Sequence, residues 1–294
     1  MKNNLLKKYA KTFYWASFFL SSEIYNKSLI IYNYCRTLDD IADLNPEFFY
    51  QLHNAEQYVG TNSKEILTKY RSYWRTKNDF ETINKEMYKL FEQEKISRKI
   101  VEDLFDGLES DCQEKVKISS KKNLLIYCYR VAGTVGLMMS KILKVHDKNS
   151  LKGAIDLGIA MQLTNIARDV MEDKKMGRQY INHDFESIIK TIKMADVFYE
   201  SSFQSIKSIP LRCRFSIIVA RRIYREIGYN IMKKKNIENY NNAGKIFVSN
   251  YEKVIQTILS FYDLIRLTFT KIEDHRLKQE HNIIMEEINL NERI

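Results

Sequence analysis

Two short acidic segments carry the side chains best suited to chemistry in this sequence. They are Asp39, Asp40 and Asp43 in the first segment, and Asn165, Asp169 and Asp173 in the second. In each segment two aspartates four residues apart project from one helix face, with Cβ atoms roughly 5–6 Å apart. Two like charges at about 6 Å repel by about 3 kcal/mol at an effective dielectric constant near 20. Divalent cations remove that repulsion, and Mg²⁺ usually binds a few carboxylates together with substrate phosphates.

The second segment belongs to a longer polar stripe. Asn165 and Gln162 lie one and two turns before Asp169 on the same face of an otherwise apolar helix. An interhelical hydrogen-bond network is the alternative interpretation. Buried carboxylates are rarely kept without a partner, which favours a metal. We therefore expect the two acidic faces to meet at one metal–diphosphate site.

A third segment, residues 127–139, combines apolar side chains with Gly133 and Gly136. Two glycines inside a helix cost roughly 1 kcal/mol each relative to alanine. Close helix packing is one explanation. The other is a channel for a long apolar ligand, to which Met138 and Met139 would give adaptable walls.

The composition predicts that helices position these segments. The 294 residues include only nine glycines and two prolines, where average usage would give roughly 20 and 15. The pattern predicts helices over 24–43, 121–145, 150–174, 183–207, 211–235 and 249–270, with more between 64 and 118. Asn45-Pro46 ends the helix over 24–43 and Gly177 stops the helix over 150–174, while Asn239 to Gly244 reads as a polar loop. We expect one domain over 1–270 and a charged tail over 271–294 that frays.

Charge and cysteine content restrict the class of protein. The net charge is +10, but Lys and Arg are scattered and form no arm, which argues against nucleic acid. The cysteines show no C-x-x-C spacing and are read as reduced residues of a cytoplasmic protein; they are Cys35, Cys112, Cys128 and Cys213. No apolar run of about 18 residues predicts a transmembrane helix. No small-residue cleavage site follows residues 13–20, so we expect no signal peptide.

Four segments together resemble the squalene/phytoene synthase family, and most of all its bacterial phytoene synthases. The segments are Tyr32–Asp43, Gly107–Asp111, Tyr127–Met139 and Gln162–Ile181. The last two are long and specific. The resemblance implies an all-α, isoprenoid-synthase-like helical bundle around a central apolar cavity. It also implies Mg²⁺, with Mn²⁺ as an alternative ion, and no nicotinamide cofactor.

The resemblance also assigns roles to residues. The implied metal-binding residues are Asp39, Asp40, Asp43, Asn165, Asp169 and Asp173. The implied diphosphate-binding residues are Thr12, Tyr32, Arg36, Gln162, Asn165, Arg168, Tyr224 and Lys245. Tyr127, with Arg36 and Arg168, is implied in catalysis. The N-terminal segment departs from the family's Ser-x-Ser-Phe pattern, since Tyr9-Ala10-Lys11-Thr12 keeps only the Thr12 hydroxyl.

The activity implied by the resemblance is a head-to-head condensation of two geranylgeranyl diphosphates. Its product would be phytoene, formed through a cyclopropyl (prephytoene) diphosphate in the first committed step of carotenoid biosynthesis. One alternative is the same reaction on C15 substrates, giving dehydrosqualene or presqualene diphosphate. Another is a non-catalytic helical homologue that acts as an assembly factor. Since the product is apolar and the chain basic, we also expect peripheral contact with an anionic membrane.

Overall fold

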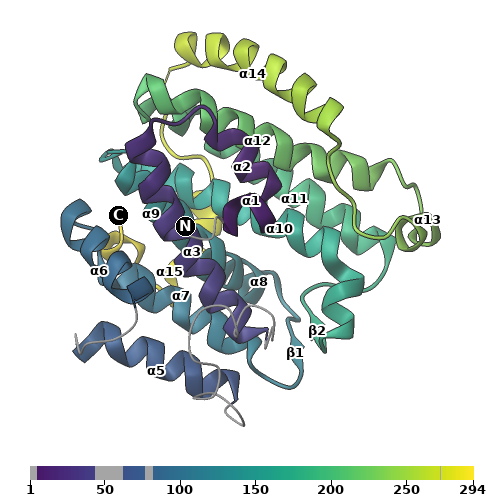
Figure 1. Cartoon of the computed structure of the whole chain (residues 1–294). Helices are drawn as coiled ribbons and strands as arrows, with labels where there is room; N and C mark the ends of the chain where they lie inside the picture. The colour runs from purple at the N-terminus through teal and green to yellow at the C-terminus, as the bar shows by residue number, and fades with distance from the viewer. Residues whose placement is uncertain (1–4, 44–61, 77–81, 272) are drawn as a thin grey trace.

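The computed structural model describes residues 5–43, 62–76, 82–271 and 273–294, and most of this chain is helical (Figure 1). The first half contains α1 (Leu5–Tyr9), α2 (Lys11–Ser17), α3 (Ser22–Ala42), α5 (Ser63–Thr76), α6 (Thr82–Glu94), α7 (Arg98–Asp111), β1 (Val116–Lys117), α8 (Lys121–Cys128), the π-helix η2 (Tyr129–Gly133) and α9 (Thr134–Ile142). The second half contains α10 (Lys148–Lys175), β2 (Arg178–Gln179), α11 (Phe185–Phe203), η3 (Gln204–Ser208), α12 (Leu211–Met232), α13 (Ile237–Asn242), α14 (Asn250–Phe269), α15 (Lys278–Met285) and η4 (Leu290–Glu292). The expected all-α fold is confirmed. Asn45-Pro46 lies outside the described residues.

Short polar side chains begin the principal helices. Asp147 accepts a hydrogen bond from the Ser150 amide at 2.8 Å and so caps α10. Asp184 caps α11 in the same way, and Ser249 with Glu252 forms a capping box at α14. At the far end of α10, Gly177 has a φ of +74°, which glycine adopts readily and which lets the chain leave the helix.

Helix α10 runs through the centre of the bundle. It contacts α9, η2, α11 and α12, and its residues on several sides are buried. Two glycines permit this close packing: a Cβ added to Gly136 would lie 2.2 Å from the Ala154 carbonyl oxygen, and one added to Gly158 would lie 2.2 Å from the Ala132 oxygen. Close backbone approach therefore explains Gly136, as one of the two interpretations predicted.

Two short segments differ from the expected pattern near the end of α10. β1 and β2 pair in parallel, with Val116 opposite Arg178, so a small strand pair stands where the composition predicts helix or loop.

The predicted loop at 239–244 is mostly the short helix α13, capped by the side chain of Asn236. Its Tyr240 is buried and donates to the carbonyl oxygens of Ala167 and Arg168 at 3.0 and 2.7 Å. The sequence does not reveal this contact, because Tyr240 lies about 70 residues from both carbonyl groups along the chain.

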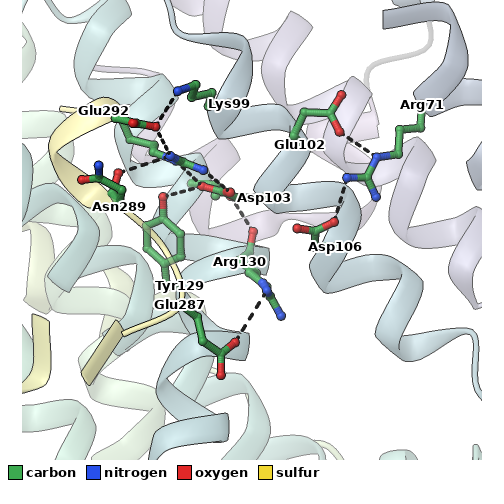
Figure 2. A network of polar contacts seen from close by, with 12 residues as sticks. Arg71, Lys99, Glu102, Asp103, Asp106, Tyr129, Arg130, Glu287, Asn289 and Glu292 are labelled. Atoms are coloured by element: carbon green, nitrogen blue, oxygen red, sulfur yellow. Dashed lines mark hydrogen bonds and ion pairs between the residues drawn. The ribbon is translucent and has the colours of Figure 1, made fainter. Parts of the chain in front are cut away.

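The C-terminal segment does not fray; it forms α15 and η4 and packs beneath α8. Figure 2 shows the polar contacts that hold it. Both Arg293 side-chain bonds to Asp103 measure 2.9 Å, Tyr129 donates to the same carboxylate at 2.9 Å, and Lys99 pairs with Glu292. Ile284 and Leu290 are buried in the main core. The irregular apolar spacing of this segment predicts fraying. It cannot show the contacts that order the segment, because their partners lie far away along the chain.

A buried cluster of Asp156, His275 and His281 fixes the same segment to α10. Each imidazole Nε2 lies within hydrogen-bond distance of a different Asp156 oxygen, at 2.8 and 2.7 Å. Burial by itself would raise the pKa of Asp156, but the two imidazoles outweigh it and hold that pKa below its usual value. The three groups are close enough to share a metal ion. Metal-bound imidazoles usually donate from their second nitrogen, whereas both Nδ1 atoms here are buried and make no hydrogen bond within the described chain, so we interpret the cluster as a hydrogen-bonded clamp.

Candidate functional site

A cavity of about 690 Å³ lies between α3, α10, α12 and the α8–η2–α9 segment, and both acidic faces reach it. This volume is typical of small-molecule sites. Its polar lining residues include Tyr32, Arg36, Asp39, Asp43, Asp111, Tyr127, Gln162, Asn165, Arg168, Asp169, Glu172, Asp173, Arg178, Tyr180, Tyr224 and Lys245. Its apolar lining residues include Leu20, Ile31, Leu104, Leu108, Val131, Val135, Met139, Leu157, Met161 and Ile217.

Polar and apolar wall residues are separated along α10. Early in the helix the lining is mostly apolar, with Gly153, Leu157 and Met161; later it is mostly polar, with Gln162, Asn165, Arg168, Asp169, Glu172 and Asp173. At 1.5 Å per residue, the lining from Gly153 to Asp173 extends about 30 Å. The cavity is therefore long, with its acidic groups near the carboxyl ends of α3 and α10. Gly136 and Met139 line it as well, while Met138 is fully buried in the core. The channel interpretation of 127–139 thus applies alongside close packing.

Carboxylates from the two helices share one electrostatic environment. Asp39 lies deep in the fold but opens on the cavity, with 47% of its side chain exposed. Burial, followed by the charge on Asp43, raises its pKa to about 7. Burial and the charge on Asp169 raise the pKa of Asp173 to about 7, and Asp43 on the other helix adds to this rise. The metal-free site therefore disfavours full ionisation of its carboxyl groups.

This crowding has a measurable consequence for stability. Raised carboxyl pKa values mean that the folded protein binds protons that the unfolded chain releases above pH 3.8, so stability falls as pH rises from about 4 to about 7. We expect the free energy of unfolding of the metal-free protein to fall between about pH 4 and 7. Chemical denaturation with chelator at several pH values measures this slope.

The matched variant Asp39→Asn/Asp173→Asn should flatten the slope, because neither side chain then titrates. Millimolar Mg²⁺ should flatten it in the unmodified protein, because bound carboxylates stay ionised. An equally steep slope in the double variant would show that the pH dependence arises elsewhere.

The donor set fits a hard divalent cation. Asn165 lines the cavity, and its Oδ1 atom is buried without a hydrogen-bond donor among the described residues. A buried amide oxygen without a partner is costly, and a cation would satisfy it. Together with Asp39, Asp43, Asp169 and Asp173 it offers only oxygen ligands, the type that Mg²⁺ and Mn²⁺ prefer.

Cationic side chains border the carboxylates. Arg168 donates to both oxygens of Asp169 at 2.8 and 2.5 Å. Lys245 lies 3.3 Å from Asp169 and also pairs with Glu172. Arg36 lies 3.1 Å from Asp39 on the opposite wall. The loop that follows α13 carries Lys245, and the bond from Tyr240 to α10 anchors this loop beside the site. Arginine and lysine beside clustered carboxylates are side chains that would bind a diphosphate.

Two predicted site residues lie elsewhere. Asp40 does not line the cavity; its carboxylate is buried and paired with Arg36 through two bonds. We therefore reassign Asp40 from the metal set to the positioning of Arg36. Thr12 on α2 is also absent from the cavity wall. Tyr9 lines the wall instead, and its ring lies on the Arg36 guanidinium, with 5.1 Å from Cζ to the ring centroid. Gln162, Tyr32 and Tyr224 all line the cavity as expected.

A tyrosine pair and an aspartate form a network that sequence reasoning missed in part. Tyr127 donates to Asp111 at 2.8 Å and lies 3.1 Å from the Tyr180 hydroxyl. Tyr180 donates to the other Asp111 oxygen at 2.6 Å, and the two rings stack at 4.7 Å. Burial raises the pKa of Asp111 to about 6 and raises that of Tyr127. The network places the hydrogen-bonded hydroxyl of Tyr127 at the cavity wall.

Arg178 is the other residue that the sequence did not single out. It donates to Asp43 at 2.6 Å and to the Asp111 carbonyl at 3.1 Å, and so links α3, α7 and β2. Asp111 and Tyr180 fall within or beside segments that carry the family resemblance, which was the available signal. Asp111 and Tyr180 are 69 residues apart, so spacing along the chain could not reveal the hydrogen bond between them.

Comparisons with known proteins identify the family of the chain and relatives of its fold. The profile of the squalene/phytoene synthase family matches residues 6–185. The chain is 29% identical to a 15-cis-phytoene synthase of Pantoea ananas over 243 residues, covering 76% of this chain and 78% of the relative. A 15-cis-phytoene synthase of Enterobacter agglomerans shares 29% identity, covering 76% and 82% of the two chains. The crystal structure of a dehydrosqualene synthase with bound ligand superimposes with a TM-score of 0.70 at 26% identity, covering 89% of this chain and 94% of that one.

Proposed function

This chain belongs to the squalene/phytoene synthase family, and from that premise we propose that it condenses two prenyl diphosphates head to head. The proposed substrates are two geranylgeranyl diphosphates and the proposed product is phytoene, formed through a cyclopropyl diphosphate. Bacterial relatives that carry the name 15-cis-phytoene synthase support the C20 reaction. The likeness to a dehydrosqualene synthase supports the C15 reaction as the second candidate.

One observation carries the proposal: four aspartates from two distant helices line the polar part of a long, otherwise apolar cavity. Asp39 and Asp43 come from the end of α3, and Asp169 and Asp173 come from α10. A diphosphate with a long hydrocarbon chain has this same division between a charged head and an apolar tail. Crowded carboxylates without bound cations destabilise the fold. A protein that acted only as a scaffold would have no use for them, which disfavours the non-catalytic alternative.

The residues of the chain support the chemistry as follows. Asp39, Asp43, Asn165, Asp169 and Asp173 would hold Mg²⁺, which when bound neutralises the diphosphate and stabilises it as a leaving group. Arg36, Arg168 and Lys245 would bind the remaining diphosphate oxygens and stabilise charge as the carbon–oxygen bond breaks. An allylic cation then forms in the cavity, and the double bond of the second substrate attacks it to give a tertiary cation. Loss of a proton from this cation to the released diphosphate closes the cyclopropane ring and gives the cyclopropyl diphosphate.

The apolar wall and the tyrosine pair would control what happens to the cation. Val131, Val135 and Met139 exclude water, which would otherwise convert the cation to an alcohol. The ring faces of Tyr127 and Tyr180 can stabilise positive charge. When the second ionisation and rearrangement end in proton loss, the Tyr127 oxygen is placed to receive the proton, with Asp111 as its hydrogen-bond partner.

Product analysis tests the proposal and separates the two substrates. Purified protein is offered labelled C15 or C20 diphosphate separately, with Mg²⁺, and the hydrocarbons are extracted and identified. We expect phytoene from the C20 substrate, with at least tenfold higher kcat/KM than for C15. Preference for C15 with a C30 product would replace the main assignment by the second candidate. Absence of diphosphate release from either substrate would favour the assembly-factor alternative.

We further propose that the protein contacts an anionic membrane surface peripherally. The net charge of +10 and the apolar character of the proposed product support this contact. No helix among the described residues is both long and apolar enough to cross a bilayer.

A further inference from the structure

Helix α14 has its polar and apolar sides reversed relative to an ordinary surface helix. Its buried side is polar: the Trp15 indole donates to Thr257 at 3.0 Å, Arg222 donates to Gln256 at 2.9 Å, and Arg222 also pairs with Asp263. Ser260 and Asp263 are almost fully buried. Surface helices normally turn their apolar residues toward the core and their charges toward water.

The side of α14 that faces solvent is apolar along its whole length. We call it the outer face of α14; its residues are Tyr251, Val254, Ile258, Phe261, Tyr262, Ile265 and Phe269. The exposed fractions are 62% for Ile258, 65% for Tyr262 and 82% for Phe269. Figure 1 shows α14 at the rim of the fold, with no element of the described chain over its outer side. A continuous exposed apolar strip of this kind marks an interaction surface.

The strip continues onto neighbouring elements. Phe261 packs on Phe215 of α12 with centroids 4.4 Å apart, and Phe215 packs edge-on against Phe19 at 4.9 Å. Phe18 and Leu211 beside them are 63% and 64% exposed. The surface therefore extends over α14, the start of α12 and the turn between α2 and α3, and it is rich in aromatic side chains, which favour the boundary between lipid and water.

Charge around the strip identifies the partner. The acidic residues of α14 point away from it, since Asp263 pairs with Arg222 and Glu252 caps the helix. Cations lie at its edges: Arg266 is half-exposed, and Lys11 and Arg212 are exposed. In a second copy meeting this face about a twofold axis, α14 would offer these cations no free carboxylate, since both of its acidic side chains are already bonded. Anionic lipid headgroups complement the cations, and acyl chains complement the strip.

We propose that the outer face of α14, with Phe18, Phe19 and Leu211, is the surface by which the protein docks on an anionic phospholipid bilayer. The inference deepens the proposed membrane contact and rests on it for the class of partner. The same segments also border the cavity: Leu20 and Ile217 line it close in sequence to Phe19 and Phe215. Docking would thus hold the apolar part of the cavity near the bilayer.

Vesicle co-sedimentation of the full chain tests the docking surface without substrate. The probes are vesicles of equimolar phosphatidylcholine and phosphatidylglycerol, compared with pure phosphatidylcholine. The unmodified protein should bind the anionic vesicles. Ile258→Glu/Phe261→Glu should weaken that binding by more than about tenfold, because two inserted apolar side chains become charged. Arg212→Gln/Arg266→Gln should weaken binding to anionic vesicles by about tenfold or more, since each cation near the surface contributes about fivefold.

The control is Val197→Glu, which adds one negative charge at an isolated apolar residue of α11 that is 52% exposed. It should bind like the unmodified protein. Equal binding by Ile258→Glu/Phe261→Glu would overturn the assignment of the face while leaving membrane contact intact, and no binding by the unmodified protein would overturn both. A milder pair, Tyr262→Ser/Ile265→Ser, gives the same readout if the charged pair does not fold.

Two further measurements keep the outcomes separate. Sedimentation velocity without lipid shows whether the same face joins two copies; a dimer that Ile258→Glu/Phe261→Glu converts to a monomer, with no vesicle binding, would assign the face to self-association and overturn the proposal. Mg²⁺-dependent diphosphate release without vesicles tests the catalytic proposal by itself. A protein that binds vesicles and releases no diphosphate would leave the docking surface standing and remove the catalytic assignment.

Discussion

Replacing Asp39 or Asp169 by asparagine should lower Mg²⁺-dependent diphosphate release by more than about 100-fold. Removing an outer partner of a metal ligand already costs 10- to 100-fold, so removing a ligand should cost more. The two aspartates lie on different helices and line the same cavity. If one cation cluster spans both helices, either substitution should have an effect of this size. Steady-state kinetics over a range of Mg²⁺ concentrations measures it.

The same substitution should have the opposite effect on the stability of the metal-free protein. Burial and the charge on Asp43 disfavour ionised Asp39, so Asp39→Asn should raise the melting temperature in chelator and reduce the rise that Mg²⁺ produces. Glu23→Gln on the same helix is the control, since its side chain is 73% exposed and pairs with Lys27. Wild-type turnover in a folded Asp39→Asn protein would remove that carboxylate from the metal site.

Local sequence patterns predicted the elements that carry the site. The scarcity of glycine and proline indicated helices, and the boundaries predicted for the central helix, 150–174, differ by one or two residues from α10 at Lys148–Lys175. Aspartates spaced by four predicted the carboxylate faces, because that spacing acts within a single helix. That the two carboxylate faces meet was a hypothesis from the sequence. In the structure, residues of both faces line the same cavity.

Contacts between distant segments were beyond local patterns. Arg293 bonds Asp103 across 190 residues and makes an ordered element of a segment that looked like a loose tail. Asp40 was assigned to the metal set in an assisting role, but its orientation toward Arg36 depends on how α3 packs. The sequence predicts a helix over 249–270, and only the fold shows that the polar side of this helix, α14, faces inward. Tertiary packing determines these cases, because the contacts with neighbouring elements determine which face of a helix is buried.

Tyr127→Phe should lower product formation by about 100-fold and leave KM within about twofold. The substitution removes only the hydroxyl that faces the cavity and donates to Asp111, and positioned proton-transfer groups contribute 10²- to 10⁴-fold. The ring, its stacking on Tyr180 and the metal-binding carboxylates all stay, so substrate binding should change little. Diphosphate release and hydrocarbon formation are measured separately in the same reaction.

Tyr129→Phe supplies the matched control for the tyrosine. Tyr129 lies two residues away in sequence, is fully buried, and donates to Asp103 at 2.9 Å, but it does not line the cavity. Both substitutions remove one buried hydrogen bond to a carboxylate and should cost stability on the order of 1–3 kcal/mol. Only Tyr127→Phe should change the ratio of hydrocarbon to released diphosphate, because a lost proton acceptor lets the cation end in other products. If both variants reduce activity in proportion to their loss of stability, the Tyr127 hydroxyl has a structural role and another group must take the proton.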